Sequence, residues 1–289
     1  MAVAGLNTTG VMAEGLPTYI ASARLVREQE GLMPNLVDKA SLGEGQGTSW
    51  NEVDVAQMSD AQGIGEGFEL ANAEEVGLTL RSATPTEIGK KIIITDRVKK
   101  RLDKKVLGQT GTLVSRTLQR KISKDGITML DGFSTSLGNG STSLSPGYVR
   151  AAVAQIMGNA TEQGSGNIAS VHHAYQIKKL ADALAPTGTY PLPTGLSEQI
   201  LRQGYKGVTI DGAAIFTDNV TAPASNAFKG GTFDREALVL VRGYDLFTEE
   251  QRIPGLRATA MWTFEEYIYI ERADSMGIEQ NHDATAPTS

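Results

Sequence analysis

The sequence predicts an α+β fold, because strands and helices follow one another without the regular strand–helix–strand alternation of a doubly wound sheet. Its length of 289 residues suffices for one large domain or two ordinary ones. Glycine accounts for 32 residues and aromatic residues for only 6% of the chain, which favours loops and extended arms around a modest core. No apolar run approaches about 18 residues, so we expect no transmembrane helix.

Cysteine is absent from the chain. This excludes disulfides, thiolate metal sites, iron–sulfur clusters and cysteine nucleophiles. The first residues lack the charged and apolar regions of a secretory signal.

The net charge of −6 conceals three blocks of opposite sign. Residues 1–89 hold 4 basic and 13 acidic residues, residues 90–124 hold 12 and 2, and residues 125–289 hold 11 and 18. A DNA-binding helix is one interpretation of the basic block. Docking onto acidic parts of the same or neighbouring chains is the other, and the acidic balance of the whole chain favours it.

The N-terminal part predicts an arm followed by a helix. Residues 1–16 are small, rich in glycine and almost uncharged, as in a flexible arm. A helix is expected to begin at Pro17, a favoured first helical position, and to end before Gly31. Pro34 begins the next segment.

Residues 43–89 predict a two-stranded β-ribbon around a loose tip, because apolar residues alternate with polar residues or glycine. The alternating residues are Val53 and Val55, then Val76, Leu78 and Leu80. An isolated two-stranded hairpin is marginally stable in water. The ribbon therefore needs another surface to lie on.

Residues 96–125 give the best helical pattern in the chain, with apolar residues three to four positions apart. A short strand, Ile92–Ile94, precedes it, and Thr95 or Asp96 can cap it. Gly126 or Gly132 is expected to end it. Gly108 and Gly111 interrupt the pattern, at a cost of about 1 kcal/mol each relative to alanine.

The remaining elements mix helices, strands and loops. The pattern predicts, in order, a loop at 134–147, a helix at 148–157, an extended segment at 168–175, a helix at 177–184, a loop at 186–197, a hairpin at 208–217, a loose loop at 222–233, a strand at 237–241, a long strand or bent hairpin at 256–270 and a polar tail from 274. The hairpin rests on Asp211-Gly212, a strong two-residue turn signal.

The sequence contains no clear motif for catalysis, cofactor binding or metal binding. The glycines of 63–67 do not follow the G-x-G-x-x-G spacing of a dinucleotide site. His172 and His173 are adjacent, so in an extended segment they face opposite sides, and His282 falls in the expected tail. Glu265 and Glu266 read as surface carboxylates. We therefore expect no catalytic, cofactor-binding or metal-binding residue, no cofactor and no enzymatic activity.

The order of the elements resembles that of the major capsid proteins of tailed bacteriophages, which have the Hong Kong 97-type fold. The resemblance rests on loose local patterns at 124–132, 169–180, 204–216 and 233–237, after the acidic ribbon and the long basic helix. It covers nearly the whole chain.

The resemblance implies a division into six segments. These are an N-terminal arm at 1–42, an extended β-ribbon loop at 43–89, a peripheral domain with the long spine helix at 90–145, an axial domain at 146–232, strands of the peripheral β-sheet at 233–273 and a C-terminal tail at 274–289.

The resemblance also implies a function. The chain is expected to be a structural protein that forms pentamers and hexamers of an icosahedral shell around viral double-stranded DNA, in a virion capsid assembled in the host cytoplasm. Expected partners are a separate scaffolding protein, because no scaffolding segment precedes Pro17, a portal and a decoration protein. Contact with packaged DNA is expected to be non-specific, and no membrane or inter-subunit cross-link is expected.

Residues expected at contacts between subunits come from the ribbon and the basic helix. They are Trp50, Val53, Val55, Val76, Leu78, Leu80, Lys99, Lys100 and Lys104. Three alternatives remain open: a nucleic-acid-binding protein that uses the helix at 96–124, a non-viral compartment shell of the same fold, and an enzyme of unassigned class.

Overall fold

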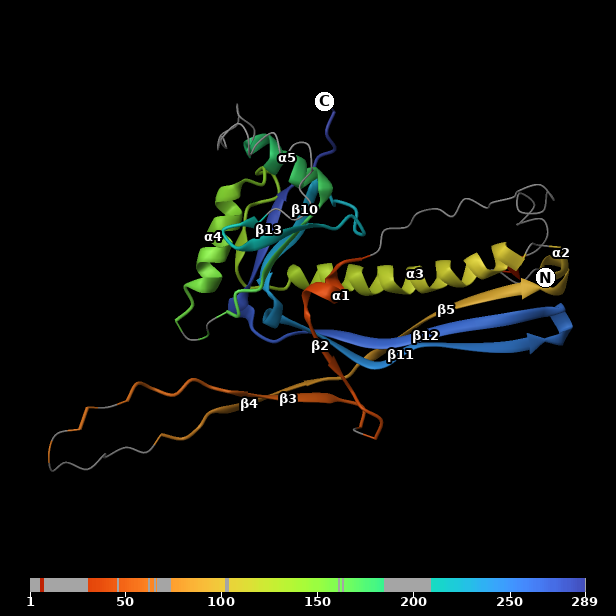
Figure 1. The fold of residues 1–289 in the computed structure, drawn as a ribbon, viewed down its shortest axis with the longest axis horizontal. Coiled ribbons are helices and arrows are strands. Elements are labelled where there is room, and N and C mark those ends of the chain that lie inside the picture. The colour runs from red at the N-terminus through yellow and green to blue at the C-terminus, as the bar shows by residue number, and fades with distance from the viewer. Residues whose placement is uncertain are drawn as a thin grey trace.

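Two sheets, an isolated ribbon and one long helix form the framework of the computed structural model (Figure 1). It describes residues 6–7, 31–45, 47–61, 63–64, 66, 74–101, 104–160, 162, 164–184 and 209–288, without the side chains of 6–7 and 104–110. The mixed α+β class is confirmed. The expected helix from Pro17 and the expected loop at 186–197 lie outside the described residues.

The first sheet has the strand order β1-β5-β12-β11-β2. Its strands are β1 (Leu6–Asn7), β5 (Thr86–Thr95), β12 (Ala258–Glu271), β11 (Leu238–Ile253) and β2 (Asp38–Ser41). The three long central strands are antiparallel, and the two short edge strands pair parallel to their neighbours. Both edges of this sheet are therefore closed by segments from the first 42 residues.

A long helical segment lies along the first sheet (Figure 1). It consists of α2 (Asp96–Arg101) and α3 (Lys104–Leu130). The expected cap is present, since the backbone N–H of Val98 donates to Thr95 Oγ1 at 3.4 Å. Of the two glycines expected to end the helix, Gly126 lies within it, and the helix ends at Leu130, close to Gly132. A Cβ at Gly126 would lie 2.9 Å from Met33 Cβ, so this glycine permits close packing and does not end the helix.

The second sheet has the strand order β6-β13-β10-β7-β9-β8. Its strands are β6 (Ser136–Leu137), β13 (Gly277–Asp283), β10 (Ala227–Asp234), β7 (Ile168–His172), β9 (Ala213–Thr217) and β8 (Thr209–Ile210). Helices α4 (Pro146–Met157) and α5 (Ala174–Leu184) share one apolar cluster with this sheet, and the C-terminal end of α3 shares another. The sheet is thus buried on both faces.

Short helices complete the described chain. They are α1 (Met33–Leu36) and the 3₁₀ turns Arg235–Ala237, Pro254–Leu256 and Asp274–Met276. The predicted hairpin at Asp211-Gly212 is confirmed, with φ values of 52° and 88° as a type I′ turn requires. Within the described part of the chain, no helix combines the length and apolar character that a membrane span needs.

Two expectations about the second sheet are wrong. The loose loop at 222–233 contains β10, a central strand, and the polar tail from 274 contains β13, which pairs with β10 over seven residues. Gly230 belongs to the strand because a Cβ there would lie 2.2 Å from the carbonyl oxygen of Val171. Glycine marks a close backbone approach at this position and not a loop.

Other boundaries also differ from the sequence expectation. The strand expected at 237–241 continues to Ile253 as β11, and the strand expected at 92–94 begins at Thr86 as β5. Ala174 and Tyr175, expected to be extended, begin α5. In each case the element is longer than its apolar pattern, because pairing and packing with neighbours extend it.

Two glycines of α3 give a matched stability prediction. We expect Gly111→Ala to stabilise the unassembled protein by about 1 kcal/mol, because helix propensity improves and a Cβ there would meet nothing within 4 Å. Gly126→Ala is expected to destabilise it, because its Cβ would crowd Met33 and Tyr269. Thermal unfolding of both variants checks this, and equal shifts of Tm would contradict it.

Candidate subunit interface

The ribbon predicted at 43–89 is present as an isolated pair of antiparallel strands. Strand β3 (Trp50–Val55) pairs with β4 (Leu78–Ala83), so that Val53 lies opposite Leu80 and Val55 opposite Leu78. Figure 1 shows the ribbon, in orange, projecting away from both sheets. Its two described strands pair with no strand of either sheet.

One face of the ribbon, which we call the outer face, is apolar and open to solvent. Val53, Val55, Leu78 and Leu80 lie on it, and Val76 just before β4 is exposed as well; the exposed fractions of these five side chains are 52–65%. Exposed apolar groups in a contiguous patch mark an interaction site. Of the predicted ribbon residues, only Trp50 departs from this face, since it is half-buried on the opposite side.

The opposite, polar face of the ribbon is tied to the end of the first sheet by two arginines. Arg272 donates to Glu52 Oε2 at 2.9 Å and to Asp38 Oδ2 at 3.0 Å. Arg81 pairs with Asp54 and donates to the carbonyl oxygen of Glu271 at 3.0 Å. The ribbon is therefore anchored through ion pairs, and its apolar face is left without a partner in the described chain.

The pKa of Asp38 reflects this anchoring. Burial disfavours the ionised form of Asp38, but hydrogen bonds from the Arg272 side chain and the Lys39 backbone outweigh burial and lower the pKa. In Arg272, burial is likewise outweighed by its bonds to Glu52 and Asp38, which raise the pKa. Both groups thus stay charged, and their ion pairs link β2, β3 and the end of β12.

A basic surface lies at the other end of the molecule, around α2. Arg97, Lys100 and Arg101 of α2 line an open hollow together with Arg252, at the end of β11, and Arg257, in the turn between β11 and β12. Of the predicted lysines, Lys100 lines this hollow. Lys99 is exposed beside it, and the side chain of Lys104 lies outside the described residues.

Arg252 and Asp96 form a two-contact ion pair at this hollow. The hydrogen bonds from Arg252 lower the pKa of Asp96 and the pKa of Arg252 is raised in turn. The pair joins the start of α2 to the end of β11. The basic run in the sequence drew attention to α2, but no spacing could indicate Arg252 and Arg257, which come about 150 residues later.

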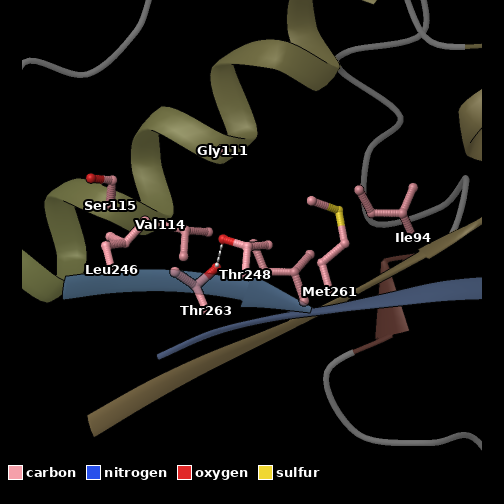
Figure 2. Close-up of a pocket in the computed structure, with 9 residues that line it drawn as sticks. Ile94, Gly111, Val114, Ser115, Leu246, Thr248, Met261 and Thr263 are labelled. Carbon is pink, nitrogen blue, oxygen red and sulfur yellow. Dashed lines mark hydrogen bonds between the residues drawn. The ribbon is translucent and has the colours of Figure 1, made fainter. Parts of the chain in front are cut away.

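A small apolar cavity separates α3 from the first sheet. Figure 2 shows its lining, in which Gly111 and Val114 of α3 face Leu246, Met261 and their neighbours on the strands. Its volume is about 90 Å³, whereas ligand pockets usually measure about 300–1,000 Å³. The cavity is therefore too small for a drug-sized ligand.

The histidines occupy an unexpected place. His282, expected in a tail, is fully buried in β13, and His172 is fully buried in β7. Burial lowers the pKa of His172 to about 3, with the nearby His282 adding to the effect, and burial lowers the pKa of His282 to about 4. Among the described residues, no three histidine or carboxylate side chains gather as metal ligands would.

Comparison with known proteins finds likeness at the level of structure. No protein-family model and no curated protein matches the sequence. A chain of Mycobacterium phage Che8 is 14% identical with a TM-score of 0.68, and the match covers 91% of this chain and 96% of that one. The capsid of a native GTA particle is 12% identical with a TM-score of 0.71, at 96% and 100% coverage. The capsid of Ralstonia phage GP4 is 10% identical with a TM-score of 0.72, at 94% and 96% coverage. The chain therefore shares the fold of these solved structures, two of which are capsids.

Proposed function

We propose that this protein is a major capsid protein, which assembles with copies of itself into an icosahedral shell around double-stranded DNA. The observation that carries the proposal is the outer face of the ribbon, an apolar surface that no described residue of its own chain covers. The likeness in fold to phage capsid structures, over more than 90% of the chain, supports the same function.

In this proposal the first sheet with α2 and α3 forms the peripheral domain and its spine helix. The ribbon at 43–89 is the extended loop that lies across a neighbouring subunit, and residues 1–42 are the N-terminal arm. The second sheet with α4 and α5 forms the axial domain, which gathers at the centres of pentamers and hexamers. Because β13 pairs within the second sheet, we assign residues 277–283 to the axial domain.

The outer-face residues would supply the hydrophobic part of each contact between subunits. Fully burying a valine or leucine side chain contributes roughly 1.5–3 kcal/mol, and the same contact recurs at every equivalent position of a symmetric shell. Lys99, Lys100 and Lys104 would add charge pairing with acidic parts of a neighbour. A scaffolding protein, a portal and a decoration protein remain proposed partners, in a virion capsid assembled in the host cytoplasm.

The mass and shape of particles test this function. Protein from its native source is expected to form closed shells in the megadalton range, seen by light scattering after size exclusion and by negative-stain microscopy. A monodisperse monomer or small oligomer from the same source would contradict the proposal. Strongly salt-dependent DNA binding by that small species would instead favour a nucleic-acid-binding protein.

A further inference from the structure

The hollow around α2 carries an excess of positive charge. Arg97, Lys100, Arg101 and Arg257 line it, and Asp96, the one acidic residue among its described lining residues, forms an ion pair with Arg252. The other four basic side chains are exposed, and no ion pair within the described chain involves them. The hollow therefore presents four cationic groups to whatever approaches it.

The backbone holds this hollow in shape. Arg257 adopts a left-handed conformation with φ of 46°, which is unfavourable for a residue with a side chain. Its carbonyl oxygen accepts from the backbone N–H of Asp96 at 2.8 Å, and its own N–H donates to the carbonyl oxygen of Pro254 at 3.1 Å. These bonds and the ion pair between Asp96 and Arg252 fix the turn against α2. The charges are thus displayed on a preformed surface.

The ribbon carries the complementary charge. Between residues 51 and 80 the sequence has seven acidic residues and no basic one. Two of them already form ion pairs at the base of the ribbon, Glu52 with Arg272 and Asp54 with Arg81. Asp60, Glu66 and Glu75 lie farther along and are exposed, and none of them forms an ion pair within the described residues.

These carboxylates cannot reach the hollow of their own chain. The ribbon and α2 lie at opposite ends of the longest axis of the molecule (Figure 1). A contact between them must therefore join two copies, head to tail. Such heterologous contacts close into rings when the rotation between copies permits, which is what a shell built from pentamers and hexamers requires.

We propose that the hollow formed by Arg97, Lys100, Arg101 and Arg257 binds the ribbon carboxylates Asp60, Glu66 and Glu75 of a second copy of this chain. The inference rests on the proposed function, because it specifies one contact of the shell. Exposed ion pairs are individually weak, so the contact acts through several charges at once. It selects the register and orientation of the neighbour, while the outer face supplies the apolar contact.

A charge-swap experiment tests the pairing. The hollow variant combines Arg97→Glu, Arg101→Glu and Arg257→Glu, and the ribbon variant combines Asp60→Lys, Glu66→Lys and Glu75→Lys. Each variant alone is expected to lower the fraction of protein that sediments as assembled particles at least about tenfold, because like charges then face each other. The chain with all six changes is expected to recover assembly. As a control, Lys90→Glu with Lys124→Glu reverses two exposed cations outside the hollow and should assemble normally.

The pairing between the hollow and the ribbon carboxylates is overturned by two results. Assembly of the hollow variant at the wild-type level, or failure of the six-change chain while both three-change chains are folded by circular dichroism, overturns the pairing. If a three-change chain does not fold, Arg257→Glu with Glu66→Lys provides the same swap at single positions. Weaker DNA binding by the hollow variant with unchanged assembly would also overturn it, in favour of a phosphate contact. Failure of the wild-type chain to form particles would instead overturn the proposed function.

Discussion

A chain that lacks residues 57–75 is expected to fold and stay soluble but to form no closed particles. The deletion leaves β3 and β4 intact, and their pairing continues to the bond from the Ala56 N–H to the Gly77 carbonyl oxygen at 2.8 Å. A short hairpin connection can join the two strands there. What is lost is the far part of the ribbon, including Met58 and Ile64, which are exposed in the described part of the chain and which the proposed function buries on a neighbouring copy. Size exclusion with light scattering provides the measurement.

The matched control is a substitution on the polar face of the ribbon. Thr79→Ser lies opposite Asp54 and away from the outer face, so it is expected to leave assembly unchanged. The outer face itself is probed by Leu78→Thr with Leu80→Thr, which should also block assembly, because two apolar anchors are removed without shortening the ribbon. Intact shells from the deletion would contradict the role that we assign to residues 43–89.

Acid is expected to destabilise the unassembled protein steeply between about pH 6.5 and pH 4.5, before the carboxylates of the surface are protonated. Burial keeps His172 and His282 neutral in the folded state, with pKa values of about 3 and about 4, whereas the unfolded chain has values near 6.5. Below that pH the unfolded state binds more protons, so stability falls as pH falls. The loss levels off only when pH passes below the folded pKa values.

The expected slope is up to about 1.4 kcal/mol per pH unit for each of the two histidines. Burial also lowers the pKa of His173, which acts in the same direction, and raises the pKa of Glu265 and Glu271, which act in the opposite one. Lys179 holds the pKa of Asp283 at about 2, so the stability from that pair is lost only at more acidic pH. The net slope above pH 4.5 is therefore that of the histidines less the opposing contribution of Glu265 and Glu271.

Urea unfolding at several pH values measures this slope. His282→Asn removes one titrating group and can keep a polar contact to Thr142, whose Oγ1 lies 3.3 Å from His282 Nδ1. The variant is expected to be less stable at neutral pH, because the packing of the imidazole against Tyr148 is lost. Its pH dependence should be flatter than that of the wild type. An unchanged slope would show that His282 does not contribute.

The sequence located the ribbon and the long helix because their patterns are local. Alternation at Val53, Val55, Leu78 and Leu80 follows from the two-residue period of a strand, and it is visible whether or not the apolar side is covered. The same pattern could not reveal which side is covered. Here the polar side packs, through Arg81 and Arg272, and the apolar side is exposed.

Strands β10 and β13 were missed because their signals are not local. Gly230 and Gly231 resemble loop residues until Val171 and Leu130 are seen packed against them. In β13, Gln280 and His282 look like a polar tail, yet both are fully buried. Gln280 Nε2 donates to Thr232 Oγ1 at 2.8 Å. Polar residues can be buried when partners from distant strands satisfy their hydrogen bonds, and a single sequence does not display those partners.

The sequence by itself determined the α+β class, the acidic ribbon, the basic helix and the absence of cysteine chemistry, since composition and short-range periodicity decide these. Only the tertiary structure decided where the ribbon's apolar face points, that Arg252 and Arg257 join α2 in one hollow, and that ribbon and hollow lie at opposite ends of the chain. The physical reason is that a surface depends on contacts between residues far apart in sequence, whereas a strand or helix pattern depends on residues that are neighbours.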